Sequence, residues 1–254
     1  MALLEQLFNE GNILSRSVAL QRMLDLTVVS KTPLQRPQIY DEVDDFYIHV
    51  LQDAEQPDGV RTLAASRIKT YLEKTDSYAA VEIAFANAIT KELRRPFLNS
   101  TYMLSLLRTL EEIRVPRELE GQKIPIVYCS LTGLMSNRDI DIVVRCAAAR
   151  VMGRMGWDEH LQFDALALAT AELVMETAVL FNASDNRNDP RWAGCGWSLY
   201  TAFHHKNAKE ATGAQPFFPK GYLNRDPDSE VVQRAYKNSI PIMAELMFNP
   251  KHNP

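Results

Sequence analysis

The fold of this chain is decided by one stretch of sequence, Asp141-Ile-Val-Val-Arg-Cys-Ala-Ala-Ala-Arg-Val-Met-Gly-Arg-Met155. Its apolar residues recur at three- and four-residue spacing, the period of a helix with a buried face. The Ala triplet is small enough to let a second helix approach closely. Asp141 suits the start of the helix, because a carboxylate there accepts hydrogen bonds from free backbone N–H groups. The stretch therefore predicts a helix packed tightly against neighbouring helices.

Two other segments, 58–72 and 228–237, resemble this stretch. Each opens with Asp and continues with Val, a nearby Arg and small residues. Val60, Val144 and Val232 hold equivalent places, 84 and 88 residues apart (144 − 60 and 232 − 144). Each gap is close to twice a repeat of about 40–47 residues. Further second helices are expected at 17–29, 98–110 and 189–203, and first helices at 41–51, 76–93, 124–134 and 161–181.

The segment 144–156 resembles the second helix of a HEAT repeat, and Asp189-Pro190-Arg191 and Asp226-Pro227-Asp228 resemble the turn between its two helices. The resemblance implies an all-α solenoid of the HEAT-like (armadillo-like) superfamily, with about six helix pairs in a single domain spanning 1–254. The terminal units, about 1–30 and 212–254, are expected to be capping or irregular. Several pairs must stack because one pair cannot bury its apolar face alone. The rival fold is an irregular helical bundle, in which 124–131 could be a buried strand.

Composition sets limits on the environment and the partners. The net charge of −4 is unhelpful for binding phosphates, so nucleic acid is an unlikely partner. The most apolar window, 161–181, contains Asp164, Glu172 and Glu176, so it predicts a helix buried on most sides rather than a membrane span. Three cysteines far apart in the sequence indicate reduced thiols and a cytoplasmic location.

The sequence contains no pattern that indicates catalysis or cofactor binding. Its five His residues show no zinc-ligand spacing, and no Cys-x-x-Cys pair or glycine-rich phosphate loop is present. His204-His205 follows an apolar helix and is expected to cap it or lie at the surface. We therefore expect no catalytic residue, no cofactor and no metal.

The segment 191–203 is the most unusual part of the chain. Trp192, Trp197 and Tyr200 surround Gly194 and Gly196, each of which costs about 1 kcal/mol in a helix relative to Ala. A close helix contact could compensate for this cost, as could a groove that needs access to the backbone. The aromatic residues either pack in the core against 161–181 or form a patch that binds a partner.

Three basic residues, Arg145, Arg150 and Arg154, occur on one predicted helix. They are either solvated surface charges or part of a surface that lines the inner face of the solenoid. Together with Trp192, Trp197 and Tyr200 they complete the set of possible partner-binding residues.

HEAT-like families mostly bind proteins, so the resemblance implies a non-catalytic scaffold or adaptor that binds a protein or peptide on its concave face. Two alternatives stay open. One is a nucleic-acid enzyme similar to the HEAT-like alkylpurine DNA glycosylases, in which Trp192, Trp197 and Asp189 could act; the acidic balance weighs against it. The other is chromophore transfer of the phycobilin-lyase type, which no residue separates from the scaffold.

Overall fold

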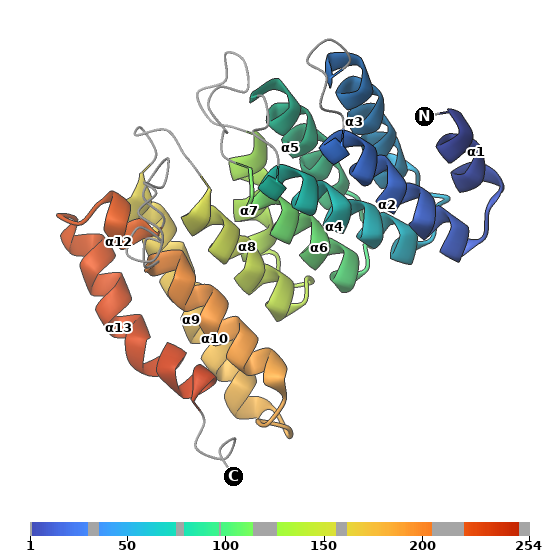
Figure 1. The fold of residues 1–254 in the computed structure, drawn as a ribbon. Coiled ribbons are helices and arrows are strands. Elements are labelled where there is room, and N and C mark those ends of the chain that lie inside the picture. The colour runs from blue at the N-terminus through green and yellow to red at the C-terminus, as the bar shows by residue number, and fades with distance from the viewer. Residues whose placement is uncertain are drawn as a thin grey trace. The chain divides into compact units, whose positions relative to one another are not determined.

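A computed structural model describes residues 2–29, 36–74, 79–96, 98–113, 126–155, 162–204 and 221–248. All regular elements in these ranges are helices, and none of the described residues lies in a strand, so the all-α prediction is confirmed (Figure 1). The chain divides into two compact units, Met1–Ile113 and Arg114–Pro254, which are described separately. The expectation of one continuous domain stays a prediction.

The described part of the first unit is built from helices that pack in two rows. α2, α4 and α6 follow one another in one row, α3 and α5 lie together in the other, and α3 packs on α4 as α5 packs on α6. α1 packs on α2. The helices are α1 (Ala2–Glu10), α2 (Ile13–Val29), α3 (Arg36–Gln52), α4 (Asp58–Lys74), α5 (Ala79–Leu93) and α6 (Ser100–Leu110).

The second unit repeats this arrangement. α8, α10 and α13 follow one another in one row, while α7 packs on both α8 and α9. α9 also contacts α10 and α13. The helices are α7 (Ile126–Ser136), α8 (Ile142–Arg154), α9 (Phe163–Ala183), α10 (Pro190–Phe203), α12 (Tyr222–Arg225) and α13 (Glu230–Met247). Because 126–131 is helical, the strand alternative for these residues is wrong.

Side-chain caps begin several helices of the second unit. The Asp141 carboxylate accepts a hydrogen bond from the Val143 backbone N–H at 2.8 Å, and Asp189 accepts one from Arg191 at 2.9 Å. The sequence predicts the cap at Asp141, whereas it places Asp189 in a turn between two helices. At the third equivalent place the cap is Ser229 rather than Asp228, with the Val232 N–H 3.1 Å from its hydroxyl. Each cap satisfies a backbone donor that the helix itself cannot.

Small residues bring α10 close to its two neighbours. A Cβ atom at Gly153 of α8 would lie 2.3 Å from the Ala202 carbonyl oxygen, and one at Gly196 would lie 2.9 Å from the Leu246 Cβ of α13. A side chain at either position would therefore push two helices apart. The close contact expected from the sequence explains Gly196. It does not explain Gly194, where an added Cβ would meet nothing within 4 Å.

Candidate functional site

Arg145 of α8 joins three helices of the second unit. Its Nε donates to the Met135 carbonyl oxygen near the end of α7 at 2.9 Å. Its two terminal nitrogens donate to the two carboxylate oxygens of Glu176 on α9, at 2.8 and 2.7 Å. These hydrogen bonds hold the pKa of the Glu176 carboxyl below its ordinary value, and the same pairing raises the pKa of Arg145. The guanidinium thus satisfies a free carbonyl at a helix end and fixes α9 beside it.

In the first unit, another arginine makes the same set of hydrogen bonds at the same spacing in the sequence. Arg61 of α4 donates from Nε to the Leu51 carbonyl oxygen at 3.0 Å, ten residues before it, and pairs with Glu92, 31 residues after it. Arg145 has the same separations from Met135 and Glu176. Both carbonyls belong to the last residue but one of a helix. The repeat seen in the sequence is therefore also a repeat of contacts.

The two copies differ in their exposure to solvent. Glu92 is fully buried, and this burial raises its pKa against the opposing effect of Arg61 and Arg95. The Glu176 side chain is 28% exposed. Solvent therefore reaches the ion pair of the second unit but not that of the first.

Beside Glu176, α9 exposes a stripe of large apolar side chains. Met175 is 58% and Val179 66% exposed, and Leu168 and Leu180 are exposed as well. Leu168, Met175 and Val179 follow one another at steps of seven and four, so they share one face of the helix, and Leu180 lies about 100° farther round it. The expectation that this helix is buried on most sides is wrong, because its other face alone packs against the core.

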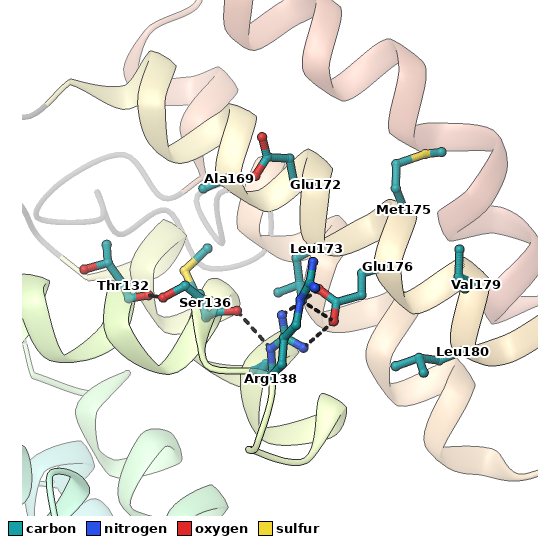
Figure 2. Close-up of a pocket in the computed structure, with 12 residues that line it drawn as sticks. Thr132, Ser136, Arg138, Ala169, Glu172, Leu173, Met175, Glu176, Val179 and Leu180 are labelled. Carbon is teal, nitrogen blue, oxygen red and sulfur yellow. Dashed lines mark hydrogen bonds and ion pairs between the residues drawn. The ribbon is translucent and has the colours of Figure 1, made fainter.

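Three of these residues, Met175, Val179 and Leu180, line a groove with a volume of about 740 Å³. Figure 2 shows the groove between α7, which contributes Thr132 and Ser136, and α9. A second hollow of about 450 Å³ shares Arg138, Arg145, Glu176 and Leu180 with the first and continues past them to Ala183, Arg191 and Trp192. We call the two together the α7–α9 groove.

The two units carry different residues at equivalent places along this surface. Arg145 and Glu176 follow Arg61 and Glu92 by 84 residues (145 − 61 and 176 − 92). At the same offset, Met175 and Val179 correspond to Lys91 and Arg95. Lys91 is exposed, and Arg95 Nε lies 3.1 Å from Glu92. The second unit thus has apolar side chains where the first has cations. Exposing such side chains to water has no folding benefit.

The structure separates the three arginines that the sequence placed together. Arg145 is buried, whereas Arg150 and Arg154 are half-buried. Five residues on a helix turn through about 140°, so Arg150 faces away from Arg145, and Arg154 lies one turn beyond Arg150. Arg145 alone among them lines the α7–α9 groove, and it contacts Glu176 there.

The aromatic side chains of α10 also differ in their exposure to solvent. Trp192 is 2% exposed, packs edge-on against Phe181 of α9, and donates from its indole N–H to the Asn186 carbonyl oxygen at 3.2 Å. Trp197 is 53% exposed and stacks on the half-buried Tyr200. Tyr200 in turn contacts Tyr236 of α13. Trp192 thus packs in the core, which is one of the two roles that the sequence allowed. Of the two tryptophans, Trp197 is the one exposed to solvent.

Comparisons with protein-family models, with curated proteins and with solved structures found no match to this chain. Within the described ranges, no group of three or more His, Cys, Asp or Glu side chains is placed to hold a metal ion. Of the described helices, none is both long enough and apolar enough to span a membrane. The α7–α9 groove is therefore the candidate site on which a function can be argued.

Sequence reasoning did not find this groove. Its apolar residues Met175, Val179 and Leu180 are ordinary core residues when a long apolar helix is considered alone. The signal was available in the repeat, since aligning the two units at the offset of 84 places Met175 against Lys91 and Val179 against Arg95.

Proposed function

We propose that this chain is a non-catalytic interaction scaffold of the HEAT-like solenoid type, and that it binds a segment of a partner protein in the α7–α9 groove. The observation that carries the proposal is the exposed apolar stripe of α9. Exposed apolar patches bordered by polar residues are typical of protein interaction sites. A reducing, cytoplasm-like compartment fits the three free thiols, Cys129, Cys146 and Cys195.

The repeated arginine supports the solenoid part of the proposal. The same guanidinium links three successive helices in each unit, with separations of ten and 31 residues both times. A contact that recurs at a fixed sequence interval is expected of stacked structural repeats, in which each unit contacts its neighbours.

The placement of individual residues favours a protein partner over nucleic acid. Trp192 is buried and Asp189 caps α10, so both side chains are engaged in the fold. The α7–α9 groove contains the exposed carboxylate of Glu172, which would repel a phosphate backbone. A groove that combines exposed apolar side chains with charges of both signs is better suited to side chains of a protein.

The proposal is tested by selecting binders from a displayed peptide library against the wild-type chain. The matched variant is Met175→Lys with Val179→Arg, which installs the residues that the first unit carries at these places. We expect the selected peptides to bind this variant at least about tenfold more weakly, because two central apolar contacts are replaced by solvated cations.

Trp197→Ala is the control, since it removes an exposed aromatic side chain outside the groove. Both variants should melt within a few degrees of the wild type. Failure to select any peptide, or equal binding to the wild type and the groove variant, would contradict the proposed function.

A further inference from the structure

Charged side chains divide the α7–α9 groove along its length. Glu172 lies on the amino-terminal half of α9, and no ion pair joins it to another described residue. Arg138 and Arg191 lie toward the carboxyl-terminal end of α9. Figure 2 shows Arg138 beside Glu176, and Glu172 farther along α9 in the direction of Ala169. One end of the groove is therefore acidic and the other contains two guanidinium groups.

The charges at the basic end retain access to solvent. Arg138 is 83% exposed, and its Nε lies 3.6 Å from a Glu176 carboxylate that Arg145 already holds through two hydrogen bonds. The Arg191 side chain is 45% exposed, and its Nε forms an ion pair with the Asp189 carboxylate at 3.3 Å. Glu176 and Arg145 largely neutralise each other in the middle of the groove. The side chains that can attract charged groups of a partner are therefore Glu172 at one end of the groove and Arg138 and Arg191 at the other.

The walls of the groove favour a helical occupant over an extended one. Both long walls are helices, whose backbone N–H and C=O groups are bonded internally except at the ends. A free strand edge, which would supply an extended peptide with a ladder of main-chain hydrogen bonds, is absent from these walls, whereas a helix satisfies its own backbone. The wall from Ala169 to Ala183 is about 21 Å long at 1.5 Å per residue, which matches an occupant of about four turns.

We propose that the α7–α9 groove binds an amphipathic helix of a partner protein that runs antiparallel to α9, with acidic residues near its amino terminus and basic residues near its carboxyl terminus. This inference rests on the proposed function and specifies the partner. In this orientation the acidic residues meet Arg138 and Arg191, and the basic residues meet Glu172. The same charge order also stabilises the occupant, because it complements the dipole of the occupant's own helix. The parallel orientation would require basic residues in its first turn and acidic residues in its last turn.

The test uses two synthetic peptides of about 18 residues with the same composition and the same Leu stripe at helical spacing. One has acidic residues in its first half and basic residues in its second, and the other has the reverse order. We expect the acidic-first peptide to bind the full chain about fivefold more tightly at low salt, and the difference to shrink at high salt, because the charges lie at the rim of the groove. Its helical circular dichroism signal should increase on binding.

The charge-swapped variant, Glu172→Arg with Arg138→Glu, should reverse the preference while leaving the affinity for an uncharged Leu-stripe peptide unchanged. Equal affinities for the two peptides, or no reversal in the variant, would overturn the inference and leave the proposed function standing, provided that both peptides bind the wild type but not the Met175→Lys, Val179→Arg variant. If neither peptide binds, the proposed function fails as well.

A second copy of this chain is the other possible occupant. Sedimentation of the wild type and of the Met175→Lys, Val179→Arg variant distinguishes it. A wild-type dimer that this double substitution converts to a monomer would overturn the inference, and a wild-type monomer that binds the acidic-first peptide supports it.

Discussion

Gly194 and Gly196 stand two residues apart on α10 but face different surroundings. Gly196 approaches α13, with only 3.0 Å between an added Cβ and the Met243 carbonyl oxygen, whereas Gly194 faces open space. We expect Gly196→Ala to lower the free energy of unfolding by about 1–3 kcal/mol through overpacking. Gly194→Ala should raise it by about 1 kcal/mol, because Ala is the better helix former. Urea denaturation of both variants measures the two effects, and changes of the same sign would contradict this explanation.

Trp192 and Trp197 provide a second matched pair on the same helix. Replacing the buried Trp192 by Ala should cost about 3–5 kcal/mol, because the change leaves a cavity beside Phe181. Replacing the exposed Trp197 by Ala should cost less than about 1 kcal/mol. Thermal melting compares them directly. A small loss at Trp192 would mean that its surroundings collapse around the gap or that it is not buried in solution.

Residue types alone could not decide which of these aromatic side chains is buried. The spacing contains part of the answer, since five residues turn a helix through about 140° and two such side chains cannot share one face. Which face meets the core depends on where α9 and α13 lie, and that is a property of tertiary packing.

Among the helices, the two buried arginines should differ in their contribution to stability. Arg61→Met leaves the fully buried Glu92 with one cation fewer, and we expect a loss of about 3–5 kcal/mol. Arg145→Met leaves Glu176 within reach of water, so the loss should be smaller, about 1–3 kcal/mol. Chemical denaturation of the two variants gives the comparison, and a larger loss at Arg145 would contradict the difference in burial.

The Glu176 carboxylate should also leave a signature in the pH dependence of stability. Its pKa is lower in the folded chain than the unfolded value of about 4.3, so its stabilising contribution is present above about pH 5. That contribution is lost as the pH falls through the folded pKa. The wild type should therefore be more stable than Glu176→Gln at pH 7, and the difference should shrink toward pH 3. Urea denaturation across this range tests the sign, and a difference that grows on acidification would show that the carboxylate is destabilising.

The positions of most helices follow from local chemistry, and the exposure of α9 does not. A carboxylate is a good cap for the start of a helix. The structure has helices directly after both Asp141 and Asp189. A run of apolar residues at helical spacing also predicts α9 itself. Which apolar face of α9 stays open depends on how α9 packs against α13, α10 and α7, and the sequence of one helix does not contain that information.

At the scale of the molecule, repetition is the feature that connects sequence, fold and proposed function. The offset of 84 residues that aligns Val60 with Val144 also aligns the two arginines and the two glutamates with which they pair. The same alignment places Met175 against Lys91 and Val179 against Arg95, which are two of the positions where the copies differ. Exposed apolar side chains in one unit, where the other has cations, are what adaptation of that unit to a partner would produce.

Methyl nuclear magnetic resonance of the labelled chain, titrated with the acidic-first peptide, tests the proposed groove most directly. The methyl signals of Met175, Val179 and Leu180 should shift on binding, while those of Leu14 and Ile240, which are exposed on α2 and α13, should not. Shifts confined to α7 and α9 would support the groove as the binding surface. Binding that leaves the α9 signals unmoved and shifts Leu14 or Ile240 instead would contradict it.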